Sequence, residues 1–146
     1  MNDIDRLRGI LSEIRPAQRY CETLNELLER LDGDEKKAWL YTQFSAKRGN
    51  SSKEMYEMKM LLKSISDCRT VIAEEISETK RQRAEAMKLI RCAQGEQEIK
   101  VLEAHYINGE TWEEIANKMS YSTRMIQNIA KKALTTISEE CKQLSL

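Results

Sequence analysis

The stretch "YINGETWEEIANKMSYSTRMIQNIAKKAL", residues 106–134, decides the fold expected for the C-terminal part of the chain. Asn108 and Gly109 predict a turn, because both residue types tolerate a positive φ angle. Thr111 followed three residues later by Glu114 is typical of a capping box, which begins a helix. A polar turn follows at residues 119–122, where Ser122 is expected to cap the next helix. The stretch therefore predicts two short helices joined by a tight turn.

Apolar residues fall on one side of each predicted helix. Those expected to be buried are Trp112, Ile115, Ala116 and Met119 in the first helix, and Met125, Ile126, Ile129, Ala133 and Leu134 in the second. Ala116 is expected where the two helices cross, because a larger side chain there would push them apart. A further helix before the turn places Ile99, Leu102, Tyr106 and Ile107 on one side. Three short helices in this arrangement predict a helix-turn-helix domain over residues 96–146.

Charges are sorted within this stretch, although the whole chain has 24 basic and 24 acidic residues. Residues 118–135 contain four basic residues and no acidic one. The residues predicted to contact DNA from the second helix are Ser122, Thr123, Arg124, Gln127, Asn128 and Lys131. Arginine can pair with guanine, glutamine and asparagine with adenine, and lysine with phosphate. We therefore expect the second helix to face double-stranded DNA and the acidic first helix to support it.

This stretch resembles region 4 of sigma-70-type factors, the helix-turn-helix that reads the −35 promoter element. More narrowly, "HYINGETWEEIANKMSYSTRMIQNIAKKAL" is similar to the phage late-gene transcriptional regulators of the RinA/ArpU type. The resemblance covers residues 96–137, and over the N-terminal arm it is only architectural. It implies that the six residues named above face DNA, and that Trp112, Ile115, Ala116 and Ile126 form the core. The sequence departs from the family pattern at three positions. Ser120 stands where such modules commonly have a turn glycine, His105 where the family often has arginine, and Ala130 where an aromatic residue or histidine is common.

Residues 1–95 predict a long helical, coiled-coil-like arm. Ile4, Leu7, Leu11 and Ile14 follow helical spacing, and the pattern resumes after Pro16 with Tyr20, Leu24, Leu27, Leu28 and Leu31. The helix is expected to stop at Asp32-Gly33. Trp39, Tyr41 and Phe44 are expected to form an aromatic cluster in the segment 34–52, whose residues 47–50 predict a mobile loop.

After a cap at Ser51 or Ser52, about forty residues contain neither glycine nor proline. One heptad frame contains Met55, Met58, Leu62, Ile65, Ile72, Ile76 and Ile90. Arg69, Thr79 and Arg83 fall in the same frame and interrupt the apolar seam. This pattern favours an antiparallel hairpin over a continuous two-stranded zipper. Because long helices without a packed partner are marginal in water, the arm is expected to pack either within the chain or on another copy. A homo-oligomer formed through the arm is the expected partner state.

The amino-acid composition limits the fold and function classes that can be expected for this chain. Aromatic residues are 5% of the chain, with one proline and five glycines, so an all-α fold is expected. No apolar run is long enough to span a membrane and no export segment is visible, which predicts a cytoplasmic protein. Cys21, Cys68, Cys92 and Cys141 have no metal-ligand spacing, so no metal or other cofactor is expected. With a single histidine and no glycine-rich phosphate loop, the chain is not expected to be an enzyme.

The expected function is sequence-specific transcription regulation, as an activator of phage or prophage late genes. In this hypothesis residues 96–146 bind DNA, and the arm of residues 1–95 dimerises or contacts RNA polymerase. One alternative is a small terminase-like subunit that recognises DNA for packaging, although that class usually carries its DNA-binding module at the N-terminus. Another is a helical module that docks on RNA polymerase. A pure coiled-coil scaffold would leave the acid-free face unexplained.

Overall fold

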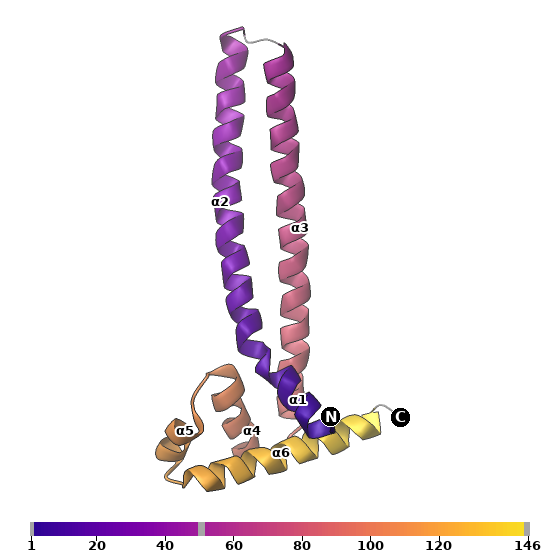
Figure 1. Ribbon diagram of the computed structural model, residues 1–146, viewed down its shortest axis with the longest axis vertical. Helices are drawn as coiled ribbons and strands as arrows, with labels where there is room; N and C mark the ends of the chain where they lie inside the picture. Colours follow the sequence, from indigo (N-terminus) through magenta and orange to yellow (C-terminus); the bar gives the residue numbers. More distant parts are fainter. Residues whose placement is uncertain (1, 50–51, 145–146) are drawn as a thin grey trace. The chain divides into compact units, whose positions relative to one another are not determined.

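The computed structural model describes residues 2–49 and 52–144, which form helices joined by short turns and contain no strand (Figure 1). The helices are α1 (Asp3–Ser12), α2 (Ile14–Lys47), α3 (Ser52–Arg91), α4 (Glu96–Leu102), the π-helical segment η1 (Glu103–Ile107), α5 (Trp112–Met119) and α6 (Thr123–Leu144). The predicted all-α class is confirmed. No helix within the described ranges is both long enough and apolar enough to cross a membrane.

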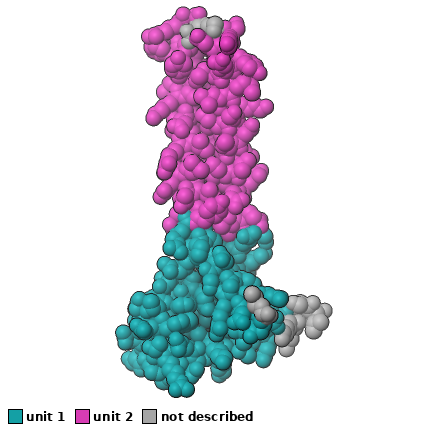
Figure 2. Space-filling view, viewed as in Figure 1, with its two compact units in different colours: residues 1–19, 80–146 teal, residues 20–79 magenta. Residues whose placement is uncertain are grey.

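The chain divides into two compact units, shown in different colours in Figure 2. Unit 1 contains residues 1–19 and 80–146, and unit 2 contains residues 20–79. These limits differ from the expected division after residue 95. The physical reason is that Leu11 and Ile90, both from the expected arm, are fully buried in one core with Ile126 of α6.

Unit 1 has an apolar core to which both ends of the chain contribute. Its fully buried large side chains are Leu11, Ile14, Ile90, Val101, Leu102, Ile115, Ile126, Leu134 and Ile137. Full burial of a leucine or isoleucine side chain contributes about 1.5–3 kcal/mol relative to exposure. This cluster is therefore the main source of stability in unit 1.

The expected core of the C-terminal helices is partly correct. Ile115, Ala116, Ile126, Ala133 and Leu134 are buried as predicted, whereas Trp112, Met119 and Ile129 are only half-buried. The prediction for Met125 is wrong, because its side chain is 48% exposed. It directly precedes the fully buried Ile126 and therefore points about 100° away from it around the helix.

Unit 2 is a helical hairpin built from the α2 and α3 residues between 20 and 79 (Figure 1). The two helices run antiparallel, since the Cys21 thiol lies 4.0 Å from the carbonyl oxygen of Ile76 and the Asp32 carboxylate lies 2.9 Å from Arg69 Nε. On α3 the less exposed positions are Met55, Met58, Leu62, Ile65, Arg69, Ile72, Ile76 and Thr79. These positions alternate at spacings of three and four, which is the heptad pattern of a helix that packs on a partner helix. Arg69 and Thr79, the polar members of this set, therefore lie within the seam.

The expected end of a helix at Asp32-Gly33 is wrong, because α2 continues without a break to Lys47. A glycine inside a helix costs about 1 kcal/mol relative to alanine. Beyond Gly33, however, α2 continues to pack on α3 through Glu35, Ala38, Thr42 and Ser45. Packing along the hairpin thus overrides the local turn signal.

The segment 34–52 also differs from its prediction. Trp39, Tyr41 and Phe44 do not pack on the hairpin, since each side chain is more than half exposed. Of the predicted loop, Lys47 is the last residue of α2, Arg48 and Gly49 form a turn, and Asn50 lies outside the described residues. Ser51 also lies outside them, and Ser52 is the first residue of α3 rather than its cap.

Ala116→Leu tests the crossing of α5 and α6. Ala116 is 3% exposed within the unit 1 core, so the larger side chain should destabilise the protein by about 1–3 kcal/mol through overpacking. Chemical denaturation followed by circular dichroism measures the change. Asn117→Leu is the matched control, because the neighbouring side chain is exposed and its replacement should leave stability nearly unchanged. Equal stability of the two variants would contradict this packing.

Candidate nucleic-acid interface

The turn before α5 is fixed by contacts within unit 1. Gly109 has φ 76°, and a Cβ atom at this position would collide with the guanidinium group of Arg15. The His105 ring stacks on Trp112 with 3.7 Å between ring centroids, and His105 Nδ1 lies 2.8 Å from the carbonyl oxygen of Glu110. Because a carbonyl oxygen only accepts hydrogen bonds, this nitrogen must donate. His105 therefore has a structural role at the start of α5.

Thr111 caps α5 as the sequence predicts. Its hydroxyl oxygen accepts a hydrogen bond from the Glu114 backbone N–H at 3.1 Å. The reciprocal contact differs from the expected one, since the Glu114 carboxylate lies 3.2 Å from the Thr111 hydroxyl. The capping pair still fixes the first turn of α5, so that Ile115 and Ala116 face the core.

The turn between α5 and α6 depends on Ser120, which adopts the left-handed conformation with φ 60° and ψ 38°. The Tyr121 backbone N–H then donates to the carbonyl oxygen of Ala116 at 3.0 Å. The Tyr121 hydroxyl accepts from Gln97 Nε2 at 2.7 Å, which ties the turn to α4. Ser122 caps α6 as expected, because its hydroxyl accepts from the Met125 N–H at 3.1 Å.

The structure places the six predicted DNA-contacting residues together at the start of α6. Ser122, Arg124, Gln127, Asn128 and Lys131 are exposed, and Thr123 is half-buried. The four residues from Arg124 to Lys131 have the spacing i, i+3, i+4 and i+7, which places them on one face of a helix. The opposite side of α6 contributes Ile126, Ala130, Ala133, Leu134 and Ile137 to the core. The polar face is therefore the side of α6 that unit 1 leaves open to solvent.

Ion pairs divide the four basic residues of segment 118–135 into two classes. Lys118 pairs with Glu110, and this hydrogen bond raises the lysine pKa. Lys132 Nζ lies 3.7 Å from the Glu98 carboxylate. Within the described ranges, Arg124 and Lys131 have no carboxylate at ion-pair distance. The two predicted cationic contacts are therefore the two whose charge no described neighbour compensates.

Met125 is the feature of this surface that the sequence pattern missed. Its exposed thioether lies on α6 between Arg124 and the buried Ile126. The available signal was the helical phase of Ile126, Ala130 and Leu134, which places Met125 outside the core stripe. An exposed methionine here can contact a thymine methyl group or an apolar protein surface.

Among the described residues, no cluster of histidine, cysteine or acidic side chains has the geometry to hold a metal ion. Comparison with family models, with curated proteins and with solved structures gives no significant match. The functional argument therefore depends on the residues of the surface itself.

Ser120→Gly tests the strain in the turn. A non-glycine residue in the left-handed conformation costs roughly 1–2 kcal/mol, part of which is offset by the greater freedom of glycine in the unfolded chain. The substitution should therefore raise the free energy of unfolding by about 0.5–1 kcal/mol. Ser138→Gly, inside α6, should lower it by about 0.5 kcal/mol. Denaturant titration of both variants measures the difference, and destabilisation by Ser120→Gly would exclude strain at this position.

Proposed function

We propose that the protein is a sequence-specific DNA-binding transcription regulator that activates phage or prophage late genes. In this proposal α5 and α6 act as a sigma-region-4-like helix-turn-helix, and α6 enters the major groove of double-stranded DNA. The supporting observation is the exposed, acid-free face of α6, whose opposite side is committed to the core. The resemblance to late-gene regulators supplies the biological context.

Each polar residue of this face has a distinct proposed role. Arg124 can donate two hydrogen bonds to guanine, and Gln127 and Asn128 can each pair with adenine. Lys131, one turn further along α6, would contact a phosphate group. Ser122 and the N-terminus of α6 would face the DNA backbone, where free N–H groups favour an anion.

The remaining parts of the proposal concern the partners and location of the protein. The protein is proposed to act in the cytoplasm, without a cofactor. The helical hairpin of unit 2, which forms most of the expected arm, is proposed to mediate self-association or to contact RNA polymerase. Long helices whose seam contains polar residues gain stability from a second partner.

A second candidate function is docking on RNA polymerase without base recognition. The exposed Met125 favours it, because apolar side chains inside a polar surface are common at protein interfaces. The same surface would also serve a small terminase-like subunit that recognises DNA for packaging. The three functions differ in which DNA, if any, the purified protein selects.

Selection from fragmented phage and host DNA at physiological salt tests the proposal. Enrichment of one short promoter-proximal motif, lost with Arg124→Ala, is the expected result. Enrichment at a packaging site would replace regulation with the terminase function. Absence of any selected motif, together with binding of the protein to RNA polymerase, would replace it with docking.

Arg124→Ala should weaken binding by about 1–3 kcal/mol at one base position and relax the sequence preference there. The reason is that the arginine fork discriminates guanine from the other bases. Binding isotherms on the selected site and on single-base variants of it measure the effect. A uniform loss on every sequence would instead assign Arg124 to the DNA backbone.

Lys131→Ala should weaken binding to all sequences by similar amounts and reduce the slope of log affinity against log salt by about one. A phosphate contact releases one counterion and carries no base information. The matched control is Lys100→Ala, which removes an exposed lysine of α4 outside the proposed surface. An unchanged slope for Lys131→Ala would remove the phosphate contact from the proposal.

A further inference from the structure

The outer half of the unit 2 hairpin, called the tip below, contains residues 36–49 and 52–63. It exposes four aromatic side chains, Trp39, Tyr41, Phe44 and Tyr56. Leu40, Met60 and Leu61 are also exposed, and the seven exposed fractions lie between 45% and 67%. They do not form one patch, because Trp39 and Tyr41 are separated by about 200° around α2. Several large apolar side chains exposed within one short segment still favour an interface there.

The seam of the tip explains why these side chains are not buried within the hairpin. On α2 the covered positions are occupied by Ala38, Thr42 and Ser45, which are all buried. The Thr42 hydroxyl donates to the carbonyl oxygen of Ala38 at 2.8 Å, so it is satisfied within its own helix. Small residues thus occupy the α2 side of the seam, where α3 contributes Met55, Met58 and Leu62, while the large apolar residues of α2 point outward. The apolar surface of the tip is therefore available only to another molecule.

The inner half of the hairpin, called the stem below, contains residues 20–35 and 64–79. It has ten acidic and two basic side chains, a net charge of −8. The tip has seven basic and two acidic side chains, a net charge of +5. The hairpin is thus strongly polarised along its length. Its stem also exposes the apolar side chains of Tyr20, Leu27 and Val71.

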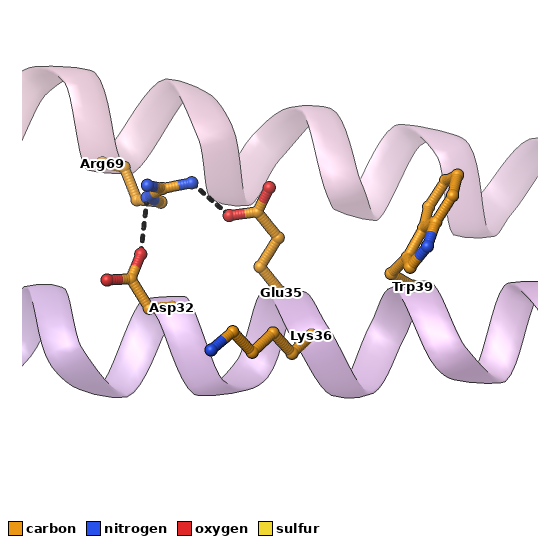
Figure 3. A pocket seen from close by; sticks show the side chains of 5 residues that line it. All are labelled: Asp32, Glu35, Lys36, Trp39 and Arg69. Carbon is orange, nitrogen blue, oxygen red and sulfur yellow. Dashed lines mark hydrogen bonds and ion pairs between the residues drawn. The ribbon is translucent and has the colours of Figure 1, made fainter.

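The sign of the charge changes at Glu35 and Lys36, which Figure 3 shows at close range. Arg69 reaches across the seam from α3 and pairs with the carboxylates of Asp32 and Glu35 on α2. Arg69 is therefore neutralised within the hairpin. Trp39 lies further along α2, on the tip side of these ion pairs. Together with Lys36 and the three ion-paired residues it lines a shallow pocket.

We infer that two copies of the chain associate through unit 2 in antiparallel orientation, with the tip of each hairpin on the stem of the other. A two-fold axis across the middle of the hairpins then creates two identical tip–stem contacts. Each contact joins a surface of charge +5 to a surface of charge −8. A parallel pair would instead place like charges together at both ends, which is unfavourable.

A nucleic acid or an acidic protein surface could also bind a basic, aromatic tip. Neither would account for the strongly acidic stem, which would repel both. A second copy uses both charged halves and covers the exposed apolar side chains on the side of each hairpin that it contacts. This inference gives the orientation of the self-association included in the proposed function, and it does not depend on DNA binding.

Sedimentation equilibrium of the reduced, full-length protein without DNA tests the inference. The wild type should form a dimer whose dissociation constant rises about tenfold or more between about 0.05 M and about 0.5 M salt, because salt screens the tip–stem attraction. A tip-reversed variant, with Lys37, Lys59 and Lys63 changed to Glu, should be monomeric at concentrations where the wild type is dimeric. All three side chains are exposed.

A charge-swapped variant distinguishes tip–stem pairing from every other arrangement. It adds five stem reversals to the three tip reversals, all at exposed side chains: Glu26→Lys, Glu29→Lys, Asp34→Lys, Asp67→Lys and Glu74→Lys. The net charge of the tip is then −1 and that of the stem +2, so the two halves again have opposite signs. Because this attraction acts only if tip meets stem, dimerisation should return. The control reverses Arg6, Lys88 and Lys100, three exposed residues of unit 1, and should remain dimeric. Circular dichroism verifies that each variant keeps its helical content.

Four results would overturn the inference. The first is a wild type that is monomeric throughout, and the second is a tip-reversed variant that still forms dimers. The third is a swapped variant that folds but stays monomeric, which would assign the tip to a different partner. The fourth is a wild-type dimer that salt strengthens, and this result decides the question even if the variants fail to fold. Loss of DNA selectivity with dimerisation intact would affect only the proposed function.

Discussion

Burial of one side of α6 is the constraint from which the arrangement of unit 1 follows. Ile126, Leu134 and Ile137 are almost completely inaccessible, and they share a core with Leu11 from α1 and Ile90 from the end of α3. An N-terminal segment and a central segment of the chain therefore stabilise the same C-terminal helix. Because this side of α6 is committed to packing, only the opposite side can present Arg124, Gln127 and Lys131 to a partner. Core packing and the candidate binding surface are thus two consequences of one helical phase.

Unit 2 is stabilised in a different way. Its seam includes Ala38, Thr42 and Ser45, and near its middle Arg69 pairs with two carboxylates. Partly exposed ion pairs of this kind contribute little net stability. Small residues bury less apolar surface than the leucine and isoleucine side chains in the unit 1 core. A hairpin with such a seam gains most from additional apolar burial on its outer surface, and the exposed aromatic residues of the tip can supply it.

The sequence predicted features that depend on neighbouring residues. Helical class, the turn at Gly109, the caps at Thr111 and Ser122 and the heptad stripe of α3 all follow from short-range spacing. The six candidate DNA-contacting residues follow from the same phase, and the structure leaves all but Thr123 exposed. The prediction for Met125 is wrong because the helical period places it about 100° from Ile126, outside the buried stripe of α6.

Features set by distant packing could not be predicted in the same way. Gly33 is a local stop signal, yet α2 continues through it because the seam with α3 extends beyond that position. Trp39 and Phe44 are of residue types that are common in cores. The neighbouring positions of α2 that are buried against α3 are, however, occupied by Ala38 and Thr42. The packing of Leu7 and Leu11 near α6 joins residues more than one hundred positions apart. No local periodicity contains that information.

A net charge of zero conceals three charged regions in this chain. The tip has a net charge of +5 and the stem −8, so the remaining residues have +3. Both proposed interactions therefore depend on electrostatic attraction, and salt should weaken DNA binding and self-association together. Suppose that only the dimer binds DNA with full affinity. At protein concentrations near the dimer dissociation constant, the slope of log DNA affinity against log salt then reports both the loss of phosphate contacts and the loss of dimer. The slope reports phosphate contacts alone only at protein concentrations well above that constant. The self-association therefore has to be measured before the number of DNA contacts on α6 can be counted.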